Sequence, residues 1–335
     1  MKLSVLDQSP ILHGEKAPDA IRNTLGLAKA CDDLGFYRYW IAEHHASPTF
    51  AGAAPEALIG ALAIVTQHLR IGSGGIMLPH YSPYKVAETF SVLASLAPER
   101  IDLGVGRGLG GGRLSSIALQ RSRDHTQNYG DFTEQVHELI AYFDKGVDLV
   151  ANEGLAALRT TLPYGQVPPK LWILGSSTDS AGLAASAGLP YCIADFINPE
   201  GRRLAQNYRR LFRPSAILEQ PYVAVATMAV AADTDERAQR LALPFIMNMA
   251  HLFRGQMIPL SSVDAALEWA RKNPALTAPP NRMSIGTAEN VKRSLMAVAE
   301  EYGAQELLIT NIVPEAEAQI DSYRLIAQAF DLKKC

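Results

Sequence analysis

Cysteine is scarce in this sequence, which has 335 residues and only three cysteines. Cys31, Cys192 and Cys335 lie far apart, and no two of them form a Cys-x-x-Cys pair. Disulfide-stapled folds and zinc knuckles depend on closely spaced cysteines, so the sequence argues against both. Sparse, scattered thiols are typical of proteins in a reducing compartment, and we expect a cytoplasmic location.

The sequence also lacks a surplus of charge and a long apolar run. Its 31 Lys and Arg residues nearly balance its 34 Asp and Glu residues, which gives a net charge of −3. A nucleic acid or an anionic membrane surface attracts a basic patch, so we expect neither as a partner. The longest apolar run, residues 223–232, is far shorter than the ~18 residues of a membrane span, and residues 1–12 lack a signal-peptide pattern.

What the sequence does contain is a regular alternation of short β-branched runs and longer helical patterns. Strands separated by helices must run parallel, because each helix returns the chain to the same end of the sheet. Eight such units at this length predict a closed (β/α)8 TIM barrel, an α/β fold, rather than an open doubly wound sheet. The strands are predicted at residues 3–6, 37–42, 69–76, 101–105, 171–174, 191–194, 222–230 and 306–310.

Two stretches do not fit the repeating unit. Residues 150–169 and 252–283 are proline-rich and carry no clear periodicity. Long irregular stretches in compact folds are usually functional lids or linkers. Both lie between units rather than between halves of differing composition, so we interpret them as insertions in one domain, residues 1–335, with 252–283 as the lid.

Glu43-His44-His45 follows the second predicted strand. Ligands of a parallel barrel bind where the strands end, and imidazole is the side chain best suited to move a proton near neutral pH. Neighbouring residues on a strand point to opposite faces, so we expect one histidine, His44, to face the site. A buried histidine satisfied by hydrogen bonds is the alternative, and a metal site would need a third ligand that the spacing does not supply.

Two loops offer contacts for a phosphate. Gly175-Ser176-Ser177 lies between a strand and a helix, where backbone N–H groups and hydroxyls suit an anion, although a serine N-cap would look the same. Arg107 lies in the glycine-rich loop 106–113, and guanidinium binds phosphate in a bidentate fork. This loop matches G-x-G-x-x-G, but the next predicted helix starts only near residue 128, which disfavours a dinucleotide-binding fingerprint. We expect one phosphorylated ligand, such as a mononucleotide cofactor.

Paired glycines, Gly74 and Gly75, end the third predicted strand. Glycines in a strand allow another molecule to approach the backbone closely. An ordinary tight turn is the alternative interpretation.

Taken in order, these motifs resemble the bacterial luciferase-like flavin-dependent monooxygenases over about residues 3–330. The resemblance rests on the order and spacing of several motifs rather than on any single one. The matching segments are Glu43-His44-His45, Ile71-Gly72-Ser73-Gly74-Gly75-Ile76-Met77-Leu78-Pro79, Pro98-Glu99-Arg100-Ile101-Asp102-Leu103-Gly104-Val105-Gly106-Arg107-Gly108, Trp172-Ile173-Leu174-Gly175-Ser176-Ser177 and Gly303-Ala304-Gln305-Glu306-Leu307-Leu308-Ile309-Thr310.

The resemblance implies a TIM barrel that binds FMN at the C-terminal ends of its strands. Reduced flavin, supplied by a separate reductase, would react with O₂ to give a C4a-peroxyflavin that oxygenates a small organic substrate. By matching position, Arg107, Ser176 and Ser177 would hold the flavin phosphate. The ring would lie against Gly74-Gly75, where the family often has a non-proline cis peptide, and His44 would handle protons. The family pairing of early helices implies a homodimer.

Two positions depart from the luciferases proper. Gly106 stands where their α chain has a cysteine, and Gly175 stands where they have a carboxylate. Both changes argue against light emission, whereas glycine at position 175 adds space and an accessible amide at the flavin site. Arginine is more abundant than lysine and alanine is frequent, which is typical of GC-rich genomes, where tailoring oxygenases of this family act on natural-product intermediates.

Three other functions stay open from the sequence. One is a deazaflavin (F420)-dependent hydride-transfer enzyme of the same fold, and another is a flavin-binding protein without turnover. An unrelated barrel enzyme acting on a sugar phosphate is the third, although it would need a lysine or paired carboxylates at the strand ends.

Overall fold

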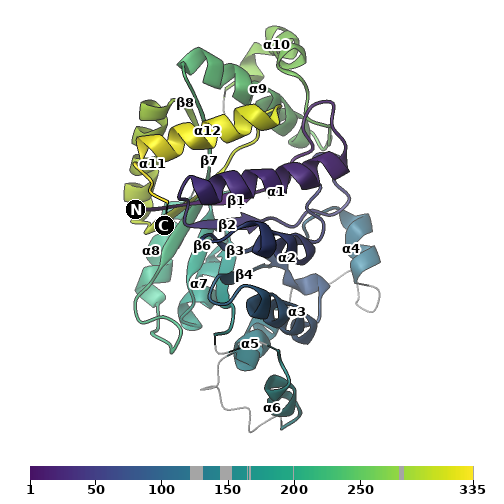
Figure 1. Ribbon diagram of the computed structural model, residues 1–335, viewed down its shortest axis with the longest axis vertical. Coiled ribbons are helices and arrows are strands. Elements are labelled where there is room, and N and C mark those ends of the chain that lie inside the picture. Colours follow the sequence, from purple (N-terminus) through teal and green to yellow (C-terminus); the bar gives the residue numbers. More distant parts are fainter. Residues whose placement is uncertain are drawn as a thin grey trace.

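The computed structural model describes residues 1–120, 131–143, 153–163, 165, 167–198, 200–278 and 283–334. Eight parallel strands close into a barrel, with helices around the outside (Figure 1). The strands in barrel order are β1 (Lys2–Asp7), β2 (Arg38–Ile41), β3 (Arg70–Met77), β4 (Ile101–Gly106), β5 (Lys170–Gly175), β6 (Tyr191–Ala194), β7 (Val223–Ala232) and β9 (Glu306–Thr310). Pairing of β9 with both β7 and β1 closes the barrel, which confirms the predicted fold class.

The helices that return the chain between strands form the outer layer. Their apolar faces pack on the outward-facing side chains of the strands, mostly in one large core, while the buried side chains of α9 form smaller clusters with the second half of β7 and its neighbours. They are α1 (Ala17–Asp33), α2 (Pro55–Val65), α3 (Pro83–Leu96), α5 (Phe132–Phe143), α7 (Thr178–Ser186), α8 (Gly201–Leu211), α9 (Asp235–Leu252), α11 (Ala288–Tyr302) and α12 (Ala316–Ala329). Of the helices in the described part of the chain, none has the length and apolarity needed to cross a bilayer.

A ninth strand, β8 (Met283–Thr287), was not predicted. It pairs with the second half of β7, from Met228 to Ala232, while β9 pairs with the first half of β7. The long strand β7 therefore extends beyond the barrel wall and carries β8 as a side strand. The strand has only five residues at the end of a proline-rich stretch, so its period was too short to detect.

Both predicted insertions contain regular structure, which corrects their description as irregular. Helix α9 continues to Leu252, and the segment after it contains α10 (Val263–Lys272) and the short 3-10 helix η2 (Pro274–Leu276). Helix α6 (Glu153–Thr160) lies in the other segment, whose residues 150–152 fall outside the described residues. Figure 1 shows α9 and α10 at one end of the molecule and α5 and α6 at the other.

The glycine-rich loop enters a helix earlier than predicted. Helix α4 (Arg113–Leu119) begins directly after Gly112 rather than near residue 128. The late helix was the argument against a dinucleotide fingerprint, and that argument was wrong. The closed barrel, in which β4 pairs with both β3 and β5, excludes the doubly wound fold on independent grounds.

A buried charge network fills the barrel at the N-terminal ends of the strands. The guanidinium of Arg38, at the start of β2, donates to Asp102 Oδ2 and to Glu306 Oε1, each at 2.5 Å. Arg70 Nη2 lies 2.6 Å from the other oxygen of Asp102, and the Tyr222 hydroxyl donates to Glu306 at 2.9 Å. Two cations thus face two carboxylates, and each buried charge has a partner.

Candidate active site

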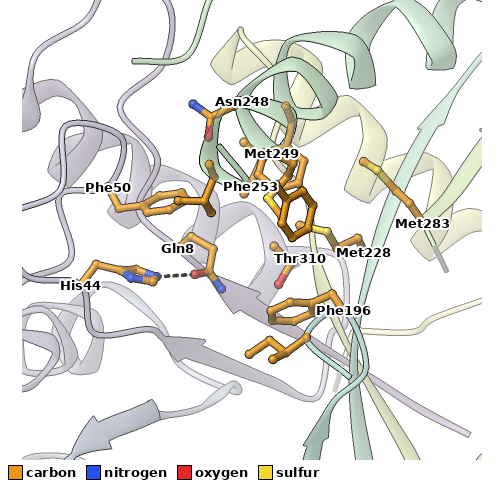
Figure 2. Close-up of a pocket in the computed structure, with 14 residues that line it drawn as sticks. Gln8, His44, Phe50, Phe196, Met228, Asn248, Met249, Phe253, Met283 and Thr310 are labelled. Atoms are coloured by element: carbon orange, nitrogen blue, oxygen red, sulfur yellow. Dashed lines mark hydrogen bonds between the residues drawn. The ribbon is translucent and has the colours of Figure 1, made fainter. Parts of the chain in front are cut away.

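The opposite end of the barrel opens into a cavity of about 310 Å³. Figure 2 shows the side chains that surround it. They come from the loops after β1, β2, β6 and β9, from β7, β8 and the end of β9, and from α9 and the residue that follows it. The lining residues are Gln8, His44, Phe50, Phe196, Ile197, Met228, Phe245, Asn248, Met249, Leu252, Phe253, Met283, Thr310 and Ile312.

His44 faces this cavity, as predicted. Its Nε2 lies 2.6 Å from Oε1 of Gln8, the residue that directly follows β1, and its ring stacks on Phe50 with centroids 4.6 Å apart (Figure 2). An amide oxygen accepts hydrogen bonds, so this contact places the ring proton on Nε2 and leaves Nδ1 as an acceptor. Gln8 is therefore the hydrogen-bond partner of His44 Nε2 at the edge of the cavity.

Burial keeps His44 uncharged. Removal of the ring from water lowers the pKa of His44 from its usual 6.5 to about 4, despite the opposing field of the Glu43 carboxylate. At neutral pH the side chain is therefore a neutral imidazole, which can accept a proton at one nitrogen while it donates from the other.

Backbone contacts hold His44 in place. The backbone N–H of His44 donates to the carbonyl of Gly52 at 2.9 Å. On the same loop, Phe50 forms an antiparallel bridge with Pro10. The loop after β2 is thus tied to the loop after β1, which fixes the distance between His44 and Gln8.

His45 points the other way, which confirms that only one of the two histidines faces the cavity. Its Nε2 donates to Glu43 Oε1 at 2.6 Å, and Glu43 also accepts from the Tyr81 hydroxyl at 2.7 Å and from the Met77 backbone N–H at 2.9 Å. The carboxylate is therefore a structural acceptor. Within the described ranges, no group of three His, Cys, Asp or Glu residues could hold a metal ion.

This cluster also supports the glycine-rich loop. The backbone N–H of His45 donates to the Gly110 carbonyl at 2.6 Å, and His80 Nε2 donates to the Leu109 carbonyl at 2.8 Å. Gly110 has φ +58°, and a Cβ there would lie 2.8 Å from the Glu43 carbonyl oxygen, so this position requires glycine. The loop that carries Arg107 is held against residues next to His44.

Arg107 and the start of α7 lie together at this end of the barrel, and we call the edge that they form the rim. Arg107 Nη1 is 3.1 Å from Oδ2 of Asp179, in the first turn of α7 and three residues after Ser176. The structure therefore brings together the two loops that the sequence predicted to share a phosphate. It also adds a residue that was not predicted, Asp179, whose carboxylate competes for the guanidinium.

The serine pair divides into two environments. Ser177 is the N-cap of α7, and its hydroxyl accepts from the backbone N–H of Ser180 at 3.3 Å. The alternative interpretation of Ser177 as a helix cap is thus confirmed. Ser176 lies one residue before the cap, and its carbonyl accepts from the Asn198 amide at 2.7 Å. A Cβ on Gly175 would lie 2.3 Å from the Ser180 hydroxyl, so glycine is needed here for the capping geometry.

Gly74 and Gly75 form a tightly packed part of the barrel wall. The peptide between them is cis, as the resemblance implied. A Cβ on Gly74 would lie 2.5 Å from Leu6 Cδ1, and one on Gly75 would lie 2.8 Å from the Gly104 carbonyl oxygen. Gly74 and Gly75 are not among the described residues that line the cavity. Arg107, Ser176 and Ser177 are not among them either.

Several residues of this region were not predicted, because their neighbours in sequence gave no motif. Gln8 follows β1 and contacts a histidine 36 residues away. Asn248 comes from α9, and its amide donates to the Ile258 carbonyl at 2.6 Å. Gln8 directly follows the observed β1 and lies two residues after the predicted strand 3–6, so a polar residue just beyond a strand was a usable signal, whereas a single Asn on a helix is not a signal.

Comparison with known proteins identifies the family to which this chain belongs. The family model for luciferase-like monooxygenases matches residues 1–310. The chain is 40% identical to Bacillus subtilis YwcH, over 98% of this chain and 99% of that protein. It is 35% identical to the Bacillus subtilis N-acetyl-S-alkylcysteine monooxygenase, with 98% of each chain covered.

Two solved structures agree. Apo-MsnO8 superposes with a TM-score of 0.89 at 33% identity, and 99% of each chain is covered. The oxygenating constituent of 3,6-diketocamphane monooxygenase from Pseudomonas putida, solved with FMN, superposes with a TM-score of 0.70 at 19% identity, over 98% of this chain and 97% of that one, which shows the fold alone. With these matches along almost its whole length, the chain belongs to the luciferase-like monooxygenase family, whose enzymes are oxidoreductases that incorporate oxygen from O₂.

Proposed function

We propose that this protein is an FMN-dependent monooxygenase that uses reduced flavin and O₂ to oxygenate a small organic substrate. The observation that carries the proposal is His44, a neutral imidazole that faces an apolar cavity where the barrel strands end. The loop that carries Arg107 contacts His45, the residue next to His44, through the Gly110 carbonyl. A neutral imidazole, an apolar cavity and a guanidinium beside a helix N-terminus thus occur at one end of the barrel.

The rim fits a phosphate monoester by the chemistry of its donors. Arg107 supplies a guanidinium, and the first turn of α7 supplies backbone N–H groups that have no partner inside the helix. The Ser176 hydroxyl lies one residue before the Ser177 cap. We propose that these groups hold the FMN phosphate, while Ser177 acts by starting the helix and Gly175 by allowing its cap. Gly74-Gly75 is the proposed contact for the flavin ring.

His44 is the proposed proton-handling residue. Reduced flavin, when bound, supplies the two electrons with which O₂ is activated. With the Nε2 proton directed at Gln8, Nδ1 of His44 is the nitrogen left to accept a hydrogen bond from a reacting group in the cavity. Gln8 acts as a positioning residue that holds this ring.

The segment of residues 252–283 is the proposed lid. It begins with Leu252 and Phe253, which line the cavity and are also partly exposed. Its Ile258 carbonyl accepts hydrogen bonds from the Thr49 hydroxyl at 3.0 Å and from the Asn248 amide at 2.6 Å. A lid tied to the cavity in this way would keep water from a reactive oxygen species.

We propose that the protein works as a homodimer in the cytoplasm and receives reduced flavin from a separate reductase. The dimer proposal is supported by α2 and α3, which pack side by side and expose Ile64 (74% exposed), Val92 (49%) and Leu96 (54%). Adjacent apolar side chains on a surface mark contact sites between proteins. Buried free thiols at Cys31 and Cys192 fit a reducing compartment.

An anaerobic titration followed by admission of air tests the proposed function. The purified protein is titrated with oxidised FMN, photoreduced FMN and reduced F420. Saturable binding of reduced FMN and a flavin spectral transient when air is admitted are expected. Absence of saturable binding would reject the proposal. Binding of F420 alone would indicate hydride transfer, and binding of FMN without faster O₂ consumption would indicate a non-catalytic flavoprotein.

A further inference from the structure

The charges around the cavity suggest which substrates it can accept. Among the described residues that line it, the side chains are apolar or carry neutral amide, hydroxyl or imidazole groups, and none is a Lys, Arg, Asp or Glu. His44 joins the neutral set, since burial lowers its pKa to about 4. An ionised carboxylate that leaves water for such a site would find no cation to replace its hydration.

Several hydrogen-bonding atoms of these neutral groups are already engaged within the protein. Oε1 of Gln8 is engaged with His44, and Figure 2 shows the Gln8 amide nitrogen directed away from that contact. The Asn248 amide nitrogen is engaged with the Ile258 carbonyl, and the Thr310 hydroxyl donates to the Leu6 carbonyl at 3.0 Å. Among the described contacts, neither N–H of the Gln8 amide is engaged, whereas one N–H of the Asn248 amide is; the Gln8 amide therefore suits a carbonyl or another acceptor oxygen on the ligand.

The entrance to the cavity is apolar as well. Phe253 is 79% exposed, Ile197 64% and Leu252 46%, and all three also line the cavity. A ligand that extended to the entrance would remove these side chains from water, which favours an apolar ligand over a polar one. The interior and the entrance of the cavity thus both favour an apolar ligand over a charged one.

From these observations we infer that the cavity selects a neutral, mainly apolar substrate with one hydrogen-bond-accepting group near Gln8, and that it excludes carboxylates. The cavity volume of about 310 Å³ leaves room for a small organic ligand. This inference rests on the proposed function in one respect, namely that the cavity ligand is the molecule that is oxygenated.

A pair of isosteric ligands tests the selection directly. 4-Phenylbutan-2-one and 3-phenylpropanoate have the same number of non-hydrogen atoms and differ in a neutral ketone against a carboxylate. Their dissociation constants are measured by calorimetry with the full chain at pH 7.5, with and without saturating oxidised FMN. The ketone is expected to bind at least about 100-fold more tightly. A smaller difference, tighter binding of the carboxylate, or binding of neither ligand under both conditions would overturn the inference.

A charge placed in the cavity provides the second arm. Met249 lines the cavity, and Met249→Lys should raise the affinity for 3-phenylpropanoate at least tenfold. Met296→Lys is the matched control, because Met296 is exposed on α11 and should leave both affinities unchanged. Phe253→Lys, at the exposed entrance, serves if Met249→Lys does not fold by circular dichroism. A folded cavity variant with unchanged carboxylate affinity would contradict the inference.

This test is separate from that of the proposed function. It requires neither reduced flavin nor O₂, so failure to bind reduced FMN would reject the monooxygenase proposal while leaving the measured ligand preference intact. Conversely, an active flavin enzyme that prefers the carboxylate would reject only the inferred substrate class.

Discussion

The two ends of the barrel contain different kinds of polar groups. At the N-terminal ends of the strands, the buried ions Arg38, Asp102 and Glu306 and the partly buried Arg70 neutralise one another. At the C-terminal ends, the described cavity lining carries only neutral polar groups, among them His44 held in its uncharged form. The first arrangement leaves no charge for a ligand, whereas the second leaves hydrogen-bonding groups that a ligand can use.

The difference indicates that the N-terminal end of the barrel mainly stabilises the fold and that the C-terminal end mainly serves binding and chemistry. Buried ions that are fully paired contribute to the fold mainly through the penalty for removing one partner. Neutral groups in an apolar cavity contribute little to the fold but decide what binds and reacts. Substitutions at the two ends should therefore separate into effects on the free energy of unfolding and effects on flavin binding or turnover.

The largest effect should come from the cavity end. His44→Ala should leave the affinity for reduced FMN unchanged and lower turnover by ~10²–10⁴-fold, the range for loss of a proton-transferring group. Steady-state O₂ consumption with reduced FMN and a substrate of the protein measures it, and His68→Ala, at an exposed position, is the control. Unchanged turnover in His44→Ala would reject its proposed role.

At the other end, Asp102→Asn should lower the free energy of unfolding by about 3–5 kcal/mol, because it leaves the buried Arg38 and the partly buried Arg70 without a full counter-charge. Urea unfolding followed by circular dichroism measures this change. Asp321→Asn, which breaks an exposed pair with Arg324, should change stability little. Equal stability of the two variants would show that the network is not a structural unit.

The rim should respond in flavin affinity alone. Arg107→Ala should weaken binding of FMN by ~1.5–3 kcal/mol, the range for a hydrogen bond to a charged group. Fluorescence quenching of FMN measures the dissociation constant, and the free energy of unfolding should stay close to that of the wild type. A variant that binds FMN normally would remove Arg107 from the phosphate site.

A smaller change of opposite sign is expected at the neighbouring carboxylate. Asp179 pairs with Arg107 at 3.1 Å and places a negative charge beside the proposed phosphate site. Asp179→Asn should free the guanidinium and tighten FMN binding several-fold, by about 1 kcal/mol. Weaker binding in Asp179→Asn would indicate that the carboxylate positions Arg107 rather than competes for it.

The smallest effect concerns pH. Because burial lowers the pKa of His44 from 6.5 to about 4, the unfolded chain binds more protons than the folded one between these values. Stability is therefore complete above pH 6.5 and falls as the pH drops toward about 4, by less than about 1 kcal/mol at pH 6. His44→Gln should flatten this part of the curve in urea unfolding at stepped pH. An identical slope in both proteins would contradict a neutral buried His44.

The sequence predicted those features that depend on local patterns. The eight barrel strands were recognised because each apolar run is followed by a helix. Strand alternation predicted only that one of His44 and His45 faces the site, and both lie in the loop after β2, which ends at Ile41. The shared rim of Arg107 and the Ser176-Ser177 loop followed from the rule that parallel strands end at one face.

Features that depend on distant partners were not predictable in this way. Arg38 and Glu306 meet across 268 residues, and each alone is an ordinary charged residue at the start of a strand. Gln8 acquires its role only through its contact with His44, and the strand β8 forms only because β7 extends beyond the barrel wall. Pairing across the barrel, rather than any local motif, creates these features.

The central claim is that the Arg107 and α7 rim recognises the phosphate of a flavin mononucleotide. The most direct measurement compares the dissociation constants of photoreduced FMN and photoreduced riboflavin, which differ by that phosphate, in the wild type and in Arg107→Ala. We predict that the wild type binds FMN at least about tenfold more tightly than riboflavin, and that this preference largely disappears in the variant. Equal affinities for the two flavins in the wild type, or an undiminished preference in Arg107→Ala, would contradict the account.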